Sequence, residues 1–510
     1  MSSATAQFAN TPELLSCLGK VIVNRELLRH LCLTSKLFQA SFNRFLYEEV
    51  WFRPNNARCL YEDIQIFLDN SSLRYTKALD LSFVSFSESK LGGPEHYNEA
   101  VQSLLLSMPG LTQFSWSDLT LYTTTISTLH QNCPKLQSLL INNQDNLEES
   151  LGGFDEWFRP ELYSFALQDL SPLSNLVELH IYEIYGDLGR FRKDLVQVLL
   201  KSPNLRSLGL SISCTTLDRI EKGDPPGNCM EHILYLMLIC HDYAAASGRP
   251  LRLKKLVLGL SIILWQPGPG DGLYIDKLVD LASLEDVYVL NRNHDTSIYF
   301  MEDDDEIDWN IFNPQQCPRL RAFGVAGMSR SVNRWVDTLE PGYLSQFRLD
   351  GSANQEDMIT LVSKLKGNYD HKIPESKMSM MAMPETHFEL PDLQGLQAVA
   401  LGLFESSERE DSRFFESLQT STDLEQMFLM IPSRYYHPPR GQLVETGFEY
   451  RIAAKCKKLR YLKINEAVWR IWRDEKLDGE TAIRFDKLDR FESKAIDVFQ
   501  HSILWSVSDG

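Results

Sequence analysis

Cysteine is scarce in this sequence, and its distribution excludes two ways of stabilising a fold. The nine cysteines are an odd number and are scattered over 510 residues without a CxxC pair. A disulfide framework or a zinc cluster would need cysteines at short, defined spacings. The fold must therefore rest on a hydrophobic core, for which a hydrophobic content of 43% is ample.

Long apolar runs are also absent. The longest, such as ILYLMLIC from Ile233, are far shorter than the ~20 residues that cross a bilayer. The stretch MSSATAQFAN at the amino terminus has no cationic start followed by an apolar run, so we read no signal peptide. We expect a soluble protein, cytoplasmic and/or nuclear, without a membrane partner.

Positive charge is in deficit. Lysine and arginine number 51 against 69 aspartates and glutamates, which gives a formal charge of −18. Binding to duplex nucleic acid or to an anionic membrane requires a cationic surface that neutralises phosphates. The charge balance therefore argues against a nucleic-acid partner and favours a basic protein partner or none.

The sequence motifs of common enzymes are missing as well. We find no GxSxG elbow, P-loop, HExxH or GxGxxG, and the glycines after Pro267 lack the lysine of a phosphate loop. The acidic run from Glu302 lacks the alternating ligands and glycine of an EF-hand. His180 and His437 have no recognisable nucleophile or carboxylate partner in the sequence. We expect no catalytic residues, no metal and no cofactor, and predict that the protein is not an enzyme.

What the sequence does contain is repetition. One phrase of an apolar residue, two others, an apolar residue, one other and a final apolar residue recurs about a dozen times. Clear copies are CPKLQSLLINN, LSNLVELHIYEI, SPNLRSLGLSI, CPRLRAFGVAGM, STDLEQMFLMI and CKKLRYLKINE, and weaker copies are MPGLTQFSWSDL, LRLKKLVLGL, LASLEDVYVLN, GYLSQFRLDG, LQGLQAVALGL and TKALDLSF.

The repeated phrase predicts a strand, because its last two apolar positions alternate with other residues. Segments with helical spacing lie between the phrases, as in GRFRKDLVQVLLKSP, where four apolar residues share one face. Prolines stand where each helix should stop. A unit of helix, turn and strand cannot bury its apolar face alone, so neighbouring units must stack into a solenoid. The helical face is formed by Phe191, Leu195, Val198 and Leu199.

These phrases resemble leucine-rich repeats, and Cys133, Cys317 and Cys456 at their starts are similar to the cysteine-containing subclass. The resemblance implies an α/β solenoid with a parallel sheet on its concave side and helices outside. We expect the three cysteines to be packed beside strands rather than reactive. The longest interval between phrases carries the methionine-rich stretch 371–393, which we expect to be an irregular loop, either a target contact or a linker.

The stretch from Thr11 to Phe38 differs from the repeats and predicts a small helical unit. Pro12 suits a first helical turn and Thr11 could cap it. Apolar residues then recur at helical spacing in two segments, and FNRFLYEEVWF adds a third. The apolar residues are Leu14, Leu15 and Leu18 in the first segment and Leu27, Leu28, Leu31 and Phe38 afterwards.

This segment resembles an F-box, the motif through which F-box proteins dock on the Skp-type adaptor of cullin-based ubiquitin ligases. Pro12, Glu13, Leu14 and Leu15 fall on the family's opening, Leu27 and Leu28 on its central Leu-Leu pair, and Ser35, Lys36 and Phe38 on its close. Leu46 and Tyr47 resemble a feature that follows many fungal F-boxes. The resemblance implies that Pro12, Glu13, Leu14, Leu15, Leu18, Leu27, Leu28, Leu31 and Phe38 bind the adaptor.

Two residues depart from the family pattern. Thr11 stands where a leucine is preferred, and Gly19 occupies a normally apolar helical position, at a cost of ~1 kcal/mol of helix stability relative to alanine. The alternative to adaptor docking is that residues 11–50 form a cap that shields the first repeat, as solenoids require.

Residues that alternate with the apolar skeleton should line the concave face, where repeat proteins commonly bind. Aromatic and arginine side chains are suited to anchor a protein interface. The candidates for binding a target protein are His180, Tyr182, Tyr288, Arg348, Phe428 and Tyr461.

The sequence thus predicts a substrate-recognition subunit of a Skp/cullin/F-box-type ubiquitin ligase, monomeric within its complex. Its partners would be the adaptor, a cullin ligase reached through it, and an unknown protein target. The alternative is a leucine-rich-repeat interaction scaffold without a ligase connection. The predicted units are an adaptor-docking motif at 1–55, a connecting helical segment at 56–72, the solenoid at 73–470 and a cap at 471–510.

Overall fold

The protein is described from a computed structural model. The structure describes residues 11–22, 24–52, 57–81, 94–117, 121–142, 170–184, 188–212, 235–247, 249–259, 262, 264, 274–289, 309–325, 330–340, 343–349, 377–380, 398–402, 415, 418, 424–430, 447–465, 467–475 and 481–488.

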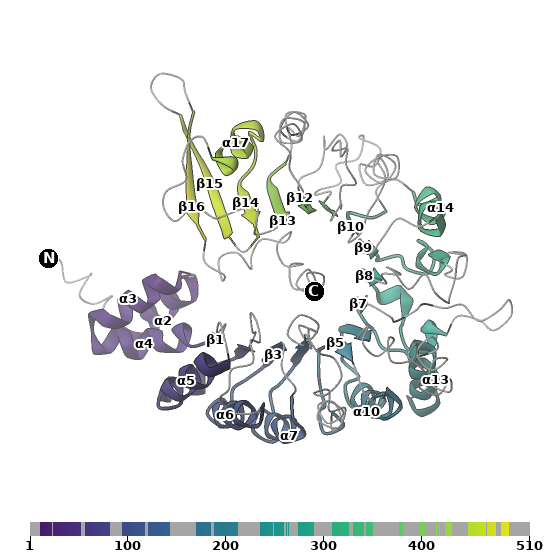
Figure 1. Cartoon of the computed structure of the whole chain (residues 1–510), viewed down its shortest axis with the longest axis horizontal. Helices are drawn as coiled ribbons and strands as arrows, with labels where there is room; N and C mark the ends of the chain where they lie inside the picture. Colours follow the sequence, from purple (N-terminus) through teal and green to yellow (C-terminus); the bar gives the residue numbers. More distant parts are fainter. Residues whose placement is uncertain are drawn as a thin grey trace, which may run out of the picture.

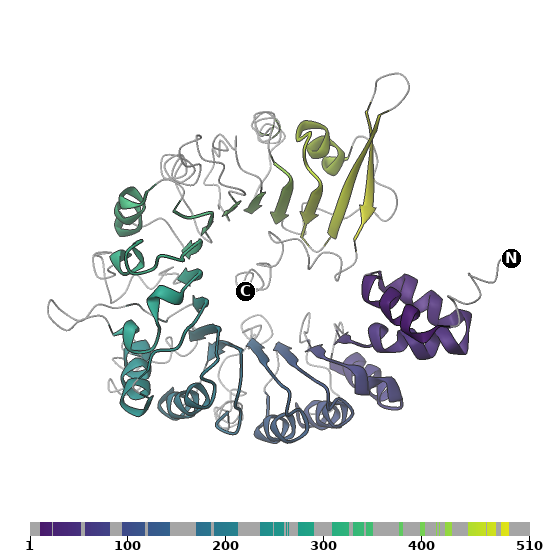
Figure 2. The same ribbon diagram turned by 180° about the vertical axis from the view of Figure 1, so that it is seen from behind.

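These residues form one α/β solenoid in which the strands follow each other in sequence order across a single curved sheet. Figure 1 shows the strands lining the inside of an arc and the helices standing outside it, and Figure 2 shows the same arrangement from behind. From β1 to β14, each strand pairs parallel with the next one in the sequence. The strands are β1 (Glu49–Phe52), β2 (Ala78–Leu81), β3 (Gln113–Ser117), β4 (Ser138–Asn142), β5 (Glu178–Ile184), β6 (Ser207–Ile212), β7 (Lys255–Leu258), β8 (Asp286–Val289), β9 (Ala322–Val325), β10 (Gln346–Leu349), β11 (Lys377–Met380), β12 (Ala398–Gly402), β13 (Gln426–Met430), β14 (Tyr461–Ile464), β15 (Ala467–Glu475) and β16 (Thr481–Lys487).

The helices fall into two groups. Three of them, before the first strand, pack on one another, and the others stand outside the sheet (Figure 1). The first group is α2 (Pro12–Val21), α3 (Arg25–Thr34) and α4 (Lys36–Leu46). The second is α5 (Ala57–Leu68), α6 (Pro94–Leu106), α7 (Thr123–Asn132), α10 (Leu188–Lys201), α13 (Tyr235–Ser247), α14 (Arg330–Thr338) and α17 (Phe448–Lys455), with the short 3-10 helices η1 (Ser71–Tyr75), η2 (Ile275–Lys277), η3 (Leu281–Ser283) and η5 (Trp309–Phe312).

A repeated hydrogen-bond arrangement marks the start of the strands. The carbonyl of Glu48 accepts from the backbone N–H groups of both Lys77 and Ala78, at 2.7 and 3.1 Å. The carbonyl of Arg206 accepts in the same way from Lys254 and Lys255, at 2.7 and 3.0 Å. The two lone pairs of one carbonyl thus hold the next strand at a fixed register. The acceptors are Glu48, Lys77, Thr112, Gln137, Val177, Arg206, Lys254, Glu285, Arg321 and Glu425.

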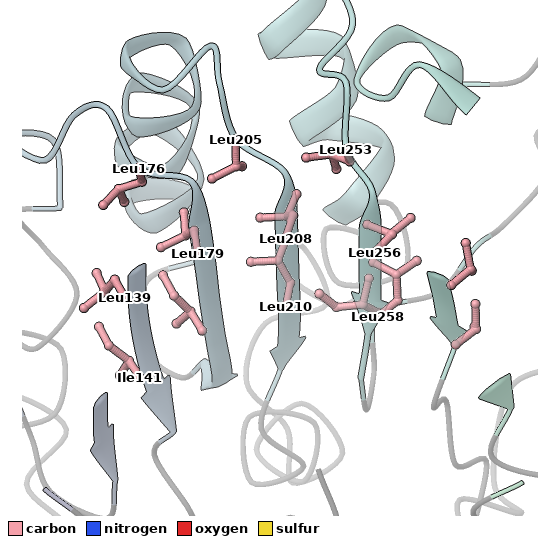
Figure 3. Close-up of a cluster of buried hydrophobic side chains, with 14 of the residues drawn as sticks. Leu139, Ile141, Leu176, Leu179, Leu205, Leu208, Leu210, Leu253, Leu256 and Leu258 are labelled. Atoms are coloured by element: carbon pink, nitrogen blue, oxygen red, sulfur yellow. The ribbon is translucent and has the colours of Figure 1, made fainter. Parts of the chain in front are cut away.

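The apolar skeleton of each repeat lies between the sheet and the helices. Figure 3 shows that equivalent leucines of neighbouring repeats line up in rows across the strands. Leu139, Leu179, Leu208 and Leu256 are paired in register and no more than 1% exposed. Burying one such side chain contributes ~1.5–3 kcal/mol. Every phrase identified in the sequence contains a strand, and Phe191, Leu195, Val198 and Leu199 of α10 are buried against the core as expected.

The three repeat cysteines are packed as predicted. Cys133, Cys317 and Cys456 are each at most 1% exposed. The Sγ of Cys133 lies 3.7 Å from the carbonyl oxygen of Met108, and that of Cys317 lies 3.5 Å from the carbonyl of Ile311. Each thiol can therefore donate a weak hydrogen bond to a carbonyl of a preceding turn while it fills the space beside a strand.

Three parts of the sheet differ from the sequence prediction. Strand β1 lies inside the range 1–55, so the sheet begins before residue 73. Strand β11 lies within the stretch expected to be an irregular loop, and it fills the long interval between β10 and β12. The boundary at 470/471 falls inside β15, which pairs antiparallel with β14 and β16. Asn465, with φ of 51°, adopts the left-handed conformation at this chain reversal, which asparagine tolerates better than most residues.

We expect iodoacetamide at about pH 8 to label the exposed Cys17 of the folded chain and to spare Cys133, Cys317 and Cys456. Burial raises the pKa of Cys133 to about 11 and the pKa of Cys317 and of Cys456 to about 12, so little thiolate is present. Mass spectrometry of the digested chain gives the labelling of each site, with the denatured chain as control. Equal labelling rates at Cys17 and the three repeat cysteines would contradict the packing described above.

Candidate functional site

The first candidate site is the three-helix unit formed by α2, α3 and α4. Leu15, Leu28 and Phe42 form its core at 0%, 3% and 0% exposure, separate from the core of the solenoid. Asn24 begins α3 by accepting a hydrogen bond from the N–H of Leu27 at 2.8 Å, and Ser35 begins α4 by accepting from Phe38 at 3.2 Å. These are standard helix caps. Thr11 precedes α2, but its side chain makes no capping hydrogen bond.

Gly19 has a packing role that the sequence did not reveal. It is buried where α2 crosses α4, and a β-carbon at this position would overlap the ring of Phe45 and lie 3.1 Å from Cδ1 of Phe42. The absence of a side chain lets two aromatic rings of α4 approach the backbone of α2. The helix-propensity cost of glycine is thus offset by close packing between the two helices.

Polar contacts join the unit to the first turns of the solenoid. The guanidinium of Arg25 donates to the carbonyl of Leu46 and, at 2.7 Å, to that of Glu49 in β1. The amide of Asn43 donates to the hydroxyl of Ser72 in η1 at 3.2 Å. A charged group that satisfies backbone carbonyls makes a stronger contact than a neutral pair. The unit is therefore fastened to the amino-terminal end of the sheet.

The predicted adaptor residues divide into a buried and a solvent-facing set. Leu15 and Leu28 support the unit from inside, and Leu18, Leu31 and Phe38 are partly buried against them. Pro12 and Glu13 are exposed. Large apolar side chains remain in water at the surface, which is the arrangement expected of a docking surface. Of the predicted adaptor residues these are Leu14 at 43% and Leu27 at 48% exposure; Val21 at 76% and Leu33 at 74% are also exposed, Leu33 on a different side of α3 from Leu27.

Replacing Gly19 by alanine should destabilise the three-helix unit, although alanine favours helix by ~1 kcal/mol. Forcing a methyl group against Phe45 should cost about 1–3 kcal/mol and outweigh that gain. Hydrogen exchange in the full chain should show faster exchange of the amides of α2 and α4. Lys20→Ala, at the exposed neighbouring position, is the control and should leave their protection unchanged; slower exchange in Gly19→Ala would refute the packing role.

The second candidate site is the inner face of the sheet, which points away from the helices. There the strands bring Tyr182, Val257, Tyr288 and Ala322 into a small apolar cluster of its own, with Leu140 packed against it. Tyr182 is 3% exposed and Tyr288 is fully buried. These two residues were predicted to contact a target, yet they are buried within the chain. A partner could reach them only after a rearrangement.

The other predicted target residues have different environments. Phe428 is only 3% exposed and lies under the ammonium group of Lys463, 4.3 Å from its ring centroid. Tyr461 is partly exposed on β14. The backbone of Arg348 belongs to β10, but its side chain lies outside the described residues. His180 is partly buried and belongs to a polar network.

That network joins three side chains above strand β6. The Nδ1 atom of His180 lies 2.7 Å from the hydroxyl of Tyr182, and its Nε2 atom lies 2.8 Å from the hydroxyl of Ser207. Gly209 lies beneath, and a β-carbon there would collide with the ring of His180 and with the hydroxyl of Tyr182 at 2.5 Å. The glycine therefore makes room for the imidazole to bridge two hydroxyl groups.

A serine beside a histidine raises the question of nucleophilic catalysis. A histidine base works best when its pKa lies near the working pH. Burial, with a smaller effect of the nearby Lys255 charge, lowers the pKa of His180 to about 3. An imidazole of that basicity is a weak acceptor for the proton of Ser207. Ser207 itself is only 7% exposed. The arrangement fits a structural hydrogen-bond network better than a catalytic one.

Stability should fall on acidification because of His180. The unfolded chain binds a proton near the ordinary pKa of 6.5, whereas folded His180 stays neutral down to about pH 3. Its contribution to the free energy of unfolding is therefore complete above pH 6.5 and is lost as the pH falls toward 3. His180→Gln should lose less stability than the wild type between about pH 7 and 5.

Denaturant midpoints at the two pH values measure the His180 effect, and His130→Gln on the exposed side of α7 is the control. The control should keep the pH dependence of the wild type. An identical pH dependence in His180→Gln and the wild type would show that His180 does not carry the effect.

The described residues hold no cluster of three or more histidine, cysteine, aspartate or glutamate side chains that could ligate a metal. None of the helices in the described ranges is both long and apolar enough to cross a bilayer.

The terminal strands carry a third group that the sequence analysis missed. Arg470, Trp472 and Arg484 lie together on one face of β15 and β16, next to Tyr461 of β14. Trp472 is 41% exposed. The signal in the sequence is the alternation of AVWRIWRDE, in which the apolar residues Trp469 and Ile471 enter the core and Arg470 and Trp472 face the other way.

Comparison with known proteins finds only a distant likeness. No family model matches the sequence, and no curated protein matches it. Among solved structures, one that resembles the fold is the complex of Rad7 and Elc1 from yeast, with a TM-score of 0.40 and 12% sequence identity. The match covers 84% of this chain and 90% of that chain. A likeness this remote assigns no function to the chain.

Proposed function

We propose that the chain is the substrate-recognition subunit of a Skp/cullin/F-box-type ubiquitin ligase. The three-helix unit would bind a Skp-type adaptor, and the solenoid would hold a protein target near the ligase. The protein itself would perform no chemistry and need no cofactor, because the ligase supplies the ubiquitin transfer and the receptor supplies proximity. We place this activity in the cytoplasm and/or nucleus.

One observation carries the proposal. The segment that resembles an F-box folds as a separate three-helix unit with its own core, and it exposes large apolar side chains at the end of a repeat solenoid. Of the central Leu-Leu pair, Leu28 enters the core at 3% exposure and Leu27 stays 48% exposed. The pair can thus hold the unit together through one leucine and offer the other to a partner.

The alternative is an interaction scaffold in which the same unit is only a cap. The hydrogen bonds from Arg25 to Glu49 and from Asn43 to Ser72 favour it, because they join the unit to the first strand and the first 3-10 helix. A cap explains the attachment of the unit to the sheet. It gives no reason for the exposure of Leu14, Val21 and Leu27, since a cap should present a polar outer surface.

Replacing Leu27 by aspartate should weaken capture of a purified Skp-type adaptor at least about tenfold, because it puts a charge into an apolar contact. Leu33→Asp is the matched control, since Leu33 is also exposed but lies six residues further, about 120° around the helix. Surface plasmon resonance with immobilised adaptor measures both variants. Circular dichroism should show an unchanged fold in each, because neither leucine is buried.

Two outcomes would contradict adaptor docking: no saturable binding of the wild type, or equal binding of Leu27→Asp and the wild type. Loss of binding in Leu33→Asp alone would move the contact to the other side of α3. A deletion of residues 1–46 is the second test, because it removes the unit and leaves β1 intact. A longer deletion to residue 50 would cut into β1 and confuse loss of docking with damage to the sheet.

A further inference from the structure

The terminal hairpin uses its arginines in different ways on its two faces. On the core side, Arg473 donates to the carbonyls of Leu459, Ala453 and Cys456 at 2.6–2.8 Å. The guanidinium of Arg473 therefore binds backbone carbonyls at and just after the end of α17. On the other side, Arg470 lies between two rings, 6.0 Å from the centroid of Tyr461 and 5.8 Å from that of Trp472.

Arg470 has no carboxylate partner in the part of the chain that the structure describes, although Asp486 lies directly across from it in the strand register. Both oxygens of Asp486 are engaged elsewhere. One accepts from the indole N–H of Trp472, and the other lies 3.4 Å from Nε of Arg484. The planar fork of Arg470 is therefore positioned by ring contacts while its N–H donors remain open to a ligand.

The neighbouring indole adds an apolar surface to this open cation. Trp472 is 41% exposed, and the Cζ atom of Arg484 also lies near its ring, 5.7 Å from the centroid. Tryptophan and arginine are the residues that most often dominate protein interfaces. In contrast, Tyr182 and Tyr288 at the centre of the inner face are buried. Among these aromatic residues of the inner face, a target can therefore reach Trp472 at the end of the sheet.

We propose that Tyr461, Arg470, Trp472 and Arg484, here called the Arg470–Trp472 surface, bind an acidic segment of a protein partner. A carboxylate of the partner takes the fork of Arg470 in a bidentate pair, and an adjacent apolar side chain packs on the Trp472 ring. This inference rests on the proposed role of the solenoid in holding a target, and it specifies the chemistry of that target.

The chain as a whole carries a formal charge of −18, which favours a basic partner, but the charges at this one surface favour an acidic group, and a carboxylate over a phosphate. Arg484 is already close to Asp486, so one guanidinium, that of Arg470, is left without a counter-ion among the described groups. Asp474 lies on the same side of β15, two residues beyond Trp472. A single carboxylate matches one open cation, whereas a phosphate with nearly two negative charges would be repelled by the two nearby aspartates.

The test uses the full chain and a fluorescent synthetic peptide rich in glutamate with two leucines, followed by fluorescence anisotropy. The comparison peptides carry glutamine or phosphoserine in place of glutamate. We expect saturable binding of the glutamate peptide that weakens about tenfold in Arg470→Gln, with loss of the preference for glutamate over glutamine. Trp472→Ala should weaken the glutamate and glutamine peptides alike. Lys487→Gln, on the opposite face of β16, removes the same charge and should bind as the wild type does.

Three results would overturn the proposal: no saturable binding of the glutamate peptide, equal binding by Arg470→Gln, or tighter binding of the phosphoserine peptide than of the glutamate peptide. Circular dichroism should show that Arg470→Gln keeps its fold, because the contacts of Arg470 are ring contacts at the surface. Adaptor capture is measured in parallel and should be unchanged in every variant. Loss of peptide binding with normal adaptor capture, or the reverse, separates failure of this surface from failure of the proposed function.

Discussion

The doubly accepting carbonyl that precedes strands β1 to β9 and β13 is the interaction on which the rest of the solenoid depends. In repeat after repeat, one backbone oxygen holds two successive N–H groups of the next unit, from Glu48 at the first strand to Arg321 at the ninth. A shift of register by one residue would turn every side chain to the opposite face. By fixing the register at its first residue, this bond keeps equivalent leucines of neighbouring units in common rows, as Figure 3 shows for β4 to β7.

The same register decides what the inner face can offer. Since alternate residues of each strand are aligned across the sheet, Leu140, Tyr182, Val257 and Tyr288 gather into one cluster, and His180 and Ser207 meet beside it. The space that Gly209 leaves is filled by the imidazole and the tyrosine hydroxyl. The centre of this face is consequently buried in the folded chain, whereas Trp472 near its end is 41% exposed.

The three-helix unit combines independence with attachment. Its core of Leu15, Leu28 and Phe42 does not merge with the core of the solenoid, so the unit can present exposed leucines without disturbing the repeats. Its attachment depends on Arg25 and on Asn43, both of which make hydrogen bonds beyond the unit. This arrangement would let a partner bound to the unit keep a defined orientation to the sheet, which a receptor that works by proximity requires.

The sequence by itself determined the repeat, the parallel strands, the burial of Cys133 and the existence of an amino-terminal helical unit, because these follow from local periodicity and from residue size. Only the tertiary structure decided features that depend on neighbours distant in the chain.

In the sequence Gly19 has the appearance of a helix defect, but in the structure the ring of Phe45 occupies the space where its side chain would be. Tyr182 and Tyr288 occupy positions of the strands that alternate with the core residues, yet both are buried in the folded chain. Strand β11 carries too weak a pattern to be recognised alone and is placed by pairing with β10 and β12. Arg470 is a candidate site because Trp472 and Arg484 contact Asp486, the aspartate across the strand pair from Arg470. These contacts involve two strands and cannot be inferred from the sequence of one.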